Sequence, residues 1–240
     1  MDNKKTMDVS IIIPAYNEEK RLGTTLKKIH SYFKDKGLNF EIIVVDDGSR
    51  DGTVNLVKNF SIDHPEVRLR CHPHNKGKGA AVKTGVLTAE GDIILFTDAD
   101  LSTPIEEFEK LKQAIENGYD IAIGSRGIES SKVILPQPWY RRYIGKIFPY
   151  LVRIIIMADI KDTQCGFKLF KKNAGIKLFK ELKAEGFAFD VEILARGKKE
   201  HLKIAEIGVL WYNSPESKVS MLKSPLKMLL ELNKIKRVLK

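Results

Sequence analysis

Ile93-Ile94-Leu95-Phe96-Thr97-Asp98-Ala99-Asp100 is the stretch around which the rest of the chain is organised. An apolar run of strand length ends there in two carboxylates, one residue apart. We expect a buried strand of a parallel sheet, because such strands are covered on both faces. The carboxylates then lie where the strand leaves the core, the edge at which open α/β sheets bind ligands. Two such side chains suit Mg²⁺ or Mn²⁺ and, through the cation, a diphosphate. The alternative is a solvated acidic turn, the commoner meaning of a single Asp-x-Asp.

Composition restricts the possible classes of protein. The chain has 240 residues, of which 43% are hydrophobic and 30% charged, as in a globular domain. Its formal net charge of +10 favours an anionic partner: nucleic acid, an anionic membrane surface or a phosphorylated substrate. Cys71 and Cys165 lack metal-type spacing, so we interpret them as reduced thiols of a cytoplasmic protein. The N-terminal residues do not form a signal peptide, and no apolar run reaches the ~18 to 20 residues of a membrane span.

Strand-like and helix-like segments alternate through the first half of the chain. Strands are predicted at 9–15, 41–45, 67–72, 93–97 and 121–124, and helices at 18–36, from 53 onward and at 104–117. Polar residues follow the strands, among them Asp46-Asp47 and Ser125-Arg126. The loop His74–Ala81 is rich in glycine and lysine and opens a helix, which favours phosphate. This alternation predicts a mostly parallel α/β sheet flanked by helices, with a binding edge.

The second half of the chain has a different pattern of predicted strands, helices and loops. We expect a loop over 132–139 and an amphipathic helix over 140–157, kinked or split at Pro149. This helix either lies in a membrane interface or faces the core. A polar turn at 162–170 leads into a short strand, a helix starts at 187–192, and a strand covers 204–212. The basic segment 221–240 is expected to be helical, either binding a surface or packing as a terminal helix.

Four segments, taken together in this order and spacing, resemble the family 2 inverting glycosyltransferases of GT-A fold. They are Ile13-Pro14-Ala15-Tyr16-Asn17-Glu18, Val44-Val45-Asp46-Asp47-Gly48-Ser49, Thr97-Asp98-Ala99-Asp100 and Gly124-Ser125-Arg126. The resemblance runs from about residue 8 to residue 223. Segments 162–170, 187–192, 205–207 and 216–218 look like the dolichyl-phosphate β-glucosyltransferase branch, close to polyprenyl-phosphate mannosyltransferases.

The resemblance implies an enzyme that moves glucose from UDP-glucose to a polyprenyl or dolichyl phosphate, with Mg²⁺ or Mn²⁺ as cofactor. It implies one GT-A domain over 1–240: 8–126 as the nucleotide-sugar half, 127–220 as the acceptor half and 221–240 as a basic amphipathic helix. Such an enzyme is expected to lie peripherally on the cytoplasmic face of a membrane, docked by the helices at 140–157 and 221–240. The alternatives are a soluble family 2 enzyme with a glycan or small-molecule acceptor, and a GDP-mannose-dependent transferase.

The resemblance also assigns roles to single residues. Asp98 and Asp100 are expected to bind the metal. We expect both to be catalytic, together with Arg126 and Asp190. The nucleotide-sugar site is expected to include Pro14, Tyr16, Glu18, Val45, Asp47, Thr97, Ala99, Ser102, Arg126 and Lys218. Lys168 and Lys218 are candidates for the acceptor phosphate. Asp190 and Glu192 occupy the region where related enzymes keep a catalytic base; because a lipid phosphate is already an anion, Asp190 alternatively orients the sugar or a loop.

Two other classes of protein fit the sequence less well. A nucleic-acid-binding module is disfavoured, because the basic residues are scattered or belong to apolar helices rather than alternating with aromatic residues. A nucleotidyltransferase shares the sheet topology, but the chain lacks a glycine-rich motif near its N-terminus.

Overall fold

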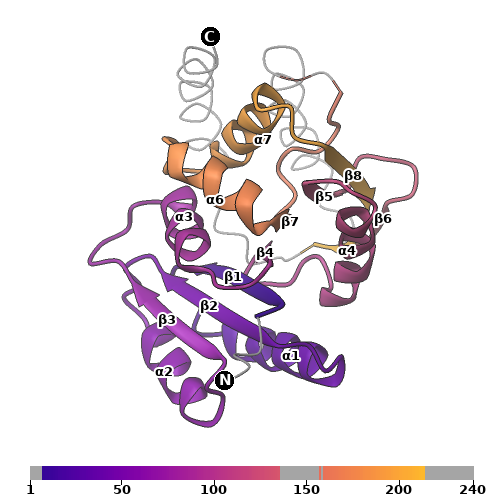
Figure 1. Ribbon diagram of the computed structural model, residues 1–240. Helices are drawn as coiled ribbons and strands as arrows, with labels where there is room; N and C mark the ends of the chain where they lie inside the picture. Colours follow the sequence, from indigo (N-terminus) through magenta and orange to yellow (C-terminus); the bar gives the residue numbers. More distant parts are fainter. Residues whose placement is uncertain (1–6, 136–156, 158, 214–240) are drawn as a thin grey trace, which may run out of the picture.

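The computed structural model describes residues 7–135, 157 and 159–213 (Figure 1). Its main element is a seven-stranded sheet in the order β3-β2-β1-β4-β7-β5-β8. Its strands are β1 (Val9–Ala15), β2 (Phe40–Asp46), β3 (Val67–Cys71), β4 (Ile93–Thr97), β5 (Ile121–Ser125), β7 (Phe167–Lys171) and β8 (Ile204–Gly208). All neighbours are parallel except that β7 runs antiparallel between β4 and β5. The predicted mostly parallel sheet is confirmed.

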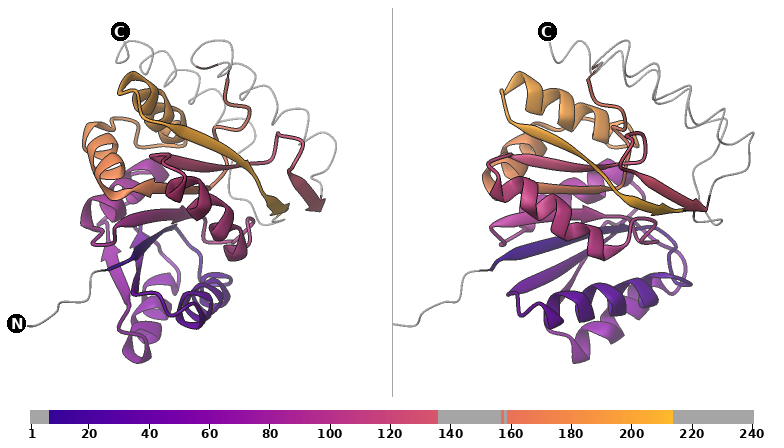
Figure 2. Two further views of the ribbon diagram at one scale, coloured as in Figure 1. Left: turned by 45° about the vertical axis from the view of Figure 1, so that its right-hand side comes forward. Right: turned by 90° about the vertical axis from the view of Figure 1, so that its right-hand side faces the viewer.

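Helices cover both faces of this sheet, which gives three layers (Figures 1 and 2). One face carries α1 (Leu22–Asp35), α2 (Thr53–Asp63) and α4 (Phe108–Glu116), the last preceded by the 3₁₀ turn η1 (Ile105–Glu107). The other face carries α3 (Lys78–Thr88), α6 (Lys172–Glu181) and α7 (Phe189–Lys199). Because successive strand residues point to opposite faces, Ile42 of β2 packs with the first group of helices and Ile43 with the second.

A second, two-stranded sheet pairs β6 (Lys132–Leu135) in parallel with β9 (Leu210–Tyr212). The prediction of a loop over 132–139 is therefore wrong for 132–135. The single strand predicted at 204–212 is instead two strands separated by Val209. The reason is that the chain changes its hydrogen-bonding partner at Val209. The Val209 N–H donates to Ser125 O of β5 at 3.2 Å, whereas the Val209 carbonyl accepts from Lys132 N of β6 at 3.1 Å.

Other predicted boundaries also change. The helix expected from residue 18 begins at Leu22, because the backbone of residues 17 and 18 is hydrogen-bonded to the start of α2 and the residues before it. Asn17 N–H donates to Ser49 Oγ and Glu18 N–H to Thr53 Oγ1, each at 2.8 Å. Helix α6 was not predicted. The helices expected over 140–157 and 221–240 lie, apart from Met157, outside the described residues. Within the described part of the chain, no helix has the length and apolarity needed to cross a bilayer.

The topology brings several loops to one edge of the sheet. The parallel strands β1, β2, β4 and β5 all end there, so Asp98, Asp100 and Arg126 leave the sheet at this edge. The antiparallel strand β7 begins there, with Phe167 opposite Thr97. The loop before β7, which contains Asp162 and Gly166, therefore joins the carboxylates.

Candidate active site

Asp98 and Asp100 follow β4 directly and each faces a cation of the protein. Asp98 Oδ1 lies 2.6 Å from Lys78 Nζ. Asp100 Oδ1 accepts a hydrogen bond from Ser102 N–H at 3.0 Å, and its Oδ2 lies 3.5 Å from Arg21 Nη1. Both carboxylates are partly exposed. The predicted acidic pair is therefore held at the sheet edge, where a ligand can reach it.

Gly166 allows the loop before β7 to approach Asp98 closely. Its carbonyl oxygen accepts the backbone N–H of Asp98 at 3.2 Å. A Cβ added to Gly166 would lie 1.9 Å from Asp98 Oδ2, a distance at which the two atoms would overlap. The position of the Asp98 carboxylate thus requires a residue without a side chain at 166.

Asp47 shapes the loop that positions Lys78. Its carboxylate accepts hydrogen bonds from the N–H groups of Lys76 at 3.0 Å and Gly77 at 2.8 Å, and lies 2.7 Å from His72 Nδ1. Gly77 has a φ of +113°, and α3 begins at the next residue. Asp47 is buried, and these partners occupy both of its oxygens. The structure therefore does not place the Asp47 carboxylate for the predicted contact with uracil.

Lys78 is the cation nearest to the acidic pair among the described residues. Burial alone would lower the pKa of its ammonium, but the Asp98 and Asp190 carboxylates raise that pKa above its usual value. The Lys78 ammonium also lies 5.2 Å from the centre of the Phe96 ring. Lys78 is therefore a positively charged group beside Asp98.

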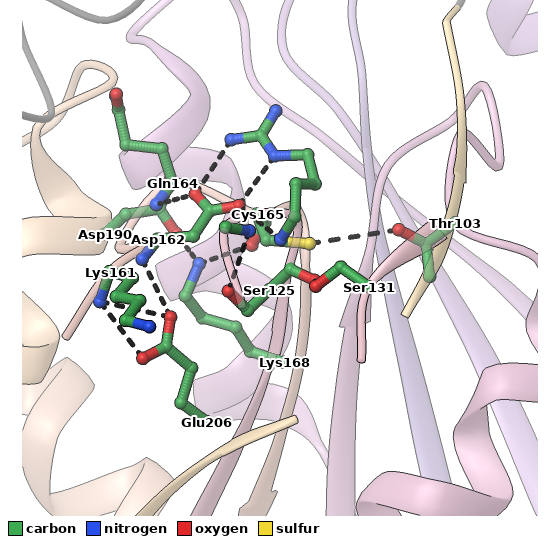
Figure 3. A network of polar contacts seen from close by, with 12 residues as sticks. Thr103, Ser125, Ser131, Lys161, Asp162, Gln164, Cys165, Lys168, Asp190 and Glu206 are labelled. Carbon is green, nitrogen blue, oxygen red and sulfur yellow. Dashed lines mark hydrogen bonds and ion pairs between the residues drawn. The ribbon is translucent and has the colours of Figure 1, made fainter. Parts of the chain in front are cut away.

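Lys168 and Asp190 form a buried ion pair in the same region (Figure 3). Lys168 Nζ donates to Asp190 Oδ1 and to Cys165 O, each at 2.5 Å. The two residues are 1% and 3% exposed. Burial raises the pKa of Asp190, an effect that the nearby ammonium groups oppose. The Lys168 ammonium, a candidate for binding the acceptor phosphate, is enclosed here and bonded to protein oxygens.

Arg126 is held by Asp162, a residue to which the sequence pattern assigned no side-chain role. Arg126 Nε and Nη2 donate to the two Asp162 oxygens at 2.7 and 2.8 Å, and the Arg126 N–H donates to Oδ2 at 2.9 Å. Burial raises the pKa of the Asp162 carboxyl, but the Arg126 guanidinium has the larger opposite effect, so the pKa is lowered to about 2. The Arg126 side chain remains 32% exposed, so it can still face an anion.

The network around Asp162 extends to β8 (Figure 3). Glu206 of β8 accepts the N–H of Asp162 at 2.8 Å and that of Lys161 at 3.0 Å. The Asp162 carboxylate also accepts Gln164 N–H at 3.2 Å. The loop that positions Arg126 is thus held to the sheet by hydrogen bonds from its backbone N–H groups to the Glu206 carboxylate.

The residues predicted near the N-terminus lie at the same edge of the sheet. Glu18 forms an ion pair with Arg21, and Arg21 also faces Asp100, so Glu18 is connected to the acidic loop. Tyr16 is 37% exposed and Pro14 is half-buried. Ser102 lies in the acidic loop, bonded through its N–H to Asp100.

Several other predicted site residues are placed elsewhere. The side chains of Val45, Thr97 and Ala99 are buried in the protein interior and pack in the core. Glu192 accepts hydrogen bonds from Ala184 N–H and Arg196 Nε, each at 2.8 Å, which is a structural role. Lys218 lies outside the described residues.

The carboxylate oxygens of Asp98 and Asp100 fit a divalent cation that is also bound by a ligand. Among the described residues, no group of three or more His, Cys, Asp or Glu side chains is placed to hold a metal ion. Asp98 and Asp100 offer two hard oxygen donors, the type that Mg²⁺ and Mn²⁺ prefer. Such ions are commonly held by one or two carboxylates together with waters and substrate phosphates.

A cavity of about 700 Å³ lies between α6 and α7, lined among others by Lys172, Lys177, Arg196 and Glu200. Lys172 N–H donates to the carbonyl of Asp92, the residue before β4. This cavity therefore lies at the opposite edge of the sheet from Asp98, and the converging charges described above take no part in it.

The chain is similar to known proteins over most of its length. The profile of Glycosyl transferase family 2 matches residues 10–179. Dolichyl-phosphate beta-glucosyltransferase ALG5C of Trichomonas vaginalis is 37% identical over 94% of this chain and 70% of its own length. The dolichyl-phosphate beta-glucosyltransferase of Drosophila melanogaster is 35% identical over 95% of this chain and 74% of its own length.

Solved structures show the same fold at lower identity. Glucosyl-3-phosphoglycerate synthase from Mycobacterium tuberculosis, in complex with UDP, has a TM-score of 0.69 at 19% identity and covers 96% of this chain and 80% of its own. Mannosyl-3-phosphoglycerate synthase from Rubrobacter xylanophilus has a TM-score of 0.71 at 17% identity and covers 98% and 74%. A third structure, of the mycobacterial enzyme with Mn²⁺ and UDP-glucose, has a TM-score of 0.66 at 19% identity and covers 94% and 79%. With a profile match over more than half of its length and long alignments to curated relatives, the chain belongs to glycosyl transferase family 2.

Proposed function

We propose that this glycosyltransferase moves glucose from UDP-glucose to a polyprenyl or dolichyl phosphate, with inversion at the anomeric carbon. The observation that carries the proposal is the convergence of Asp98 and Asp100 with Lys78 and Arg126 at one edge of the sheet. The names of the relatives, which match most of both chains, support the choice of glucose and of a lipid phosphate.

Asp98 and Asp100 are the residues that would hold Mg²⁺ or Mn²⁺. When bound, the ion supplies positive charge to the diphosphate of the donor. Lys78 and Arg126 are placed to add fixed positive charge beside it, which lowers the energy of the leaving UDP. An acceptor phosphate oxygen then forms a bond to the anomeric carbon as the bond from that carbon to the UDP oxygen breaks.

The acceptor in this reaction needs no general base. A lipid phosphate is anionic at neutral pH, so its oxygen attacks without losing a proton. Asp190 is bonded to Lys168 in a buried pair, which suits a residue that orients its surroundings. We therefore assign Asp190 to positioning rather than to proton transfer.

A donor screen tests this proposal. Radiolabelled UDP-glucose, UDP-N-acetylglucosamine and GDP-mannose are offered with and without polyprenyl phosphate, and the label that enters the organic phase is counted. We expect organic-soluble label from UDP-glucose, and only with the lipid and Mg²⁺ or Mn²⁺ present. Transfer from GDP-mannose alone, or transfer only to water-soluble acceptors, would contradict it.

Asp98→Asn and Asp100→Asn test the role of the acidic pair in the same assay. Each change removes one negative charge from the metal site, so we expect transfer to fall at least ~10²-fold. Asp63→Asn is a matched control, because Asp63 is exposed at the end of α2. Full activity in the Asp98 or Asp100 variants would rule out the proposed metal site.

A lipid acceptor also implies work at a membrane surface, and we propose peripheral attachment to the cytoplasmic face. The net charge of +10 favours anionic lipid. Sedimentation with anionic vesicles tests this point, with binding expected at low salt and loss of binding expected as salt rises. An absence of salt-sensitive binding would contradict it.

A further inference from the structure

Exposed apolar side chains gather on the two-stranded sheet, which we call the β6–β9 ribbon. Val133, Ile134 and Tyr212 are 43%, 49% and 39% exposed. The pairing of β6 with β9 shifts register between Val133 and Leu135, so Ile134 lies at an irregularity of the strand. Single apolar residues on a surface are ordinary. Three of them on a sheet made of two short strands form a local apolar surface that calls for a partner.

This ribbon is attached directly to the candidate active site. Tyr212 N–H donates to Ser102 O at 2.8 Å, and Ser102 N–H donates to Asp100 Oδ1 at 3.0 Å. Trp211 lies under Arg126, with the guanidinium carbon 5.6 Å from the ring centre. In Figure 2, β8 continues into β9, which runs beside β6 beyond the main sheet. A ligand anchored near Arg126 and Asp100 therefore has apolar surface next to it.

The other exposed large apolar residues do not offer such a surface. Tyr16, after β1, is a single exposed side chain at the edge of the sheet that carries the acidic pair. The remaining three are Ile62 on α2, Leu87 on α3 and Tyr119 after α4. These three belong to separate elements, away from the loops that carry the acidic pair, and within the described part of the chain Tyr16 has no second exposed large apolar side chain on its own element. Among the described residues, the ribbon is thus where several exposed apolar side chains adjoin the charged site.

Building on the proposed function, we propose that the β6–β9 ribbon contacts the first isoprene units of the acceptor. A polyprenyl phosphate joins an anionic head to a branched apolar chain. Its head must reach the donor at the charged edge of the sheet, so the chain leaves from that point. The ribbon matches both parts of this molecule: Arg126 and Trp211 are next to the head, and Val133, Ile134 and Tyr212 are along the chain. A sugar or other hydrophilic acceptor would leave these side chains in water.

Acceptors of increasing chain length test the contact. The variant Val133→Thr/Ile134→Thr keeps β-branched side chains and hence strand preference, but makes the ribbon polar. Assays use detergent micelles, UDP-glucose, and polyprenyl phosphates from two to eleven isoprene units. For the longer acceptors we expect the KM of the variant to rise about tenfold, because apolar contact area is lost. We expect kcat and the KM for UDP-glucose to stay within about twofold of wild type.

Control variants separate this effect from a loss of folding. Tyr212→Ser removes an exposed side chain from the other strand and keeps the backbone hydrogen bond to Ser102, so its acceptor KM should also rise. Ile62→Thr, at an apolar residue that is 78% exposed on α2, should leave the acceptor KM unchanged.

The outcomes distinguish the two proposals. If the wild type glucosylates polyprenyl phosphate and the ribbon variants keep its KM at every chain length, the ribbon proposal is wrong while the proposed function stands. Weaker binding of the variants to acceptor-free vesicles, with an unchanged KM in micelles, would also overturn it, since the ribbon would then contact the bilayer. If the wild type transfers no glucose to polyprenyl phosphates of any length, the proposed function itself fails.

Discussion

At the scale of single residues, the site consists of acidic side chains that are each held by a cation. Lys78 faces Asp98, Arg21 faces Asp100, Lys168 holds Asp190 and Arg126 holds Asp162. Buried or half-buried charges of one sign would repel each other strongly without these partners. The partners also differ in exposure, since Lys168 is enclosed whereas Arg126 keeps about a third of its side-chain surface. The exposed cations are the ones available to a ligand.

Lys78→Met tests the role of the cation beside Asp98. The change removes a positive charge from the place where the diphosphate would bind, so we expect kcat/KM for UDP-glucose to fall about 10²-fold. Steady-state kinetics measure this effect. Lys76→Met, at an exposed position of the same loop, is the control and should remain within about twofold of wild type. An equal loss in both variants would mean that the loop, and not the Lys78 charge, matters.

Because the pKa of Asp162 is lowered on folding, we expect its contribution to the free energy of unfolding to depend on pH. Its pKa is lowered to about 2 in the folded protein, so the stabilisation is fully present above the pKa of the unfolded chain and is lost as the pH falls toward 2. The size of the shift corresponds to about 2 kcal/mol. Urea unfolding at pH 6 and pH 3 should therefore show that Asp162→Asn costs less stability at the lower pH. An equal cost at both values would contradict the assignment, and Asp63→Asn should show little cost at either.

At the scale of elements, the sequence predicts what depends on local pattern. The strands that end in Ala15, Asp46, Thr97 and Ser125 follow from short apolar runs, and their parallel pairing follows from the helices between them. The strand at Lys132–Leu135 could not be predicted because, among the described residues, its strand partner lies at 210–212, far along the chain. The break at Val209 was missed because β8 and β9 are continuous in apolar pattern and differ only in partner.

The same distinction between local sequence pattern and contacts with distant parts of the chain applies to the candidate site. Asp98, Asp100 and Arg126 could be predicted because they stand at strand ends. The pairing of Lys168 with Asp190 could not be predicted, since nothing in the local sequence shows that the Lys168 ammonium turns inward. The Val45 side chain is buried because its strand is covered on both faces. Asp162 and Gly166 act through contacts across 36 and 68 residues of chain, to Arg126 and Asp98, which no local pattern contains.

Gly166→Ala tests the junction between β4 and the start of β7. The added methyl group would overlap Asp98 Oδ2, so we expect the carboxylate to move and transfer to fall at least tenfold while the protein stays folded. Gly127→Ala is the control, because a Cβ there meets its nearest atom at an ordinary 3.5 Å. Activity and circular dichroism measured together separate displacement of Asp98 from unfolding. Unchanged activity in Gly166→Ala would show that the Asp98 position is not critical.

At the scale of the whole molecule, the chain's two halves build one sheet. Strand β7, from the second half, lies between β4 and β5 of the first. The loop before β7 thereby reaches Asp98, and the end of β8 leads into the ribbon beside Arg126. The donor and the acceptor are expected to meet along this single edge.

We propose that Asp98 and Asp100 bind a nucleotide diphosphate through a divalent cation. Calorimetric titration of UDP-glucose into the protein, with and without Mn²⁺, tests it most directly because it requires no acceptor. We expect Mn²⁺ to tighten binding at least tenfold in the wild type and in Asp63→Asn, and to have no effect in Asp98→Asn/Asp100→Asn. The same gain from Mn²⁺ in the double variant would contradict the account.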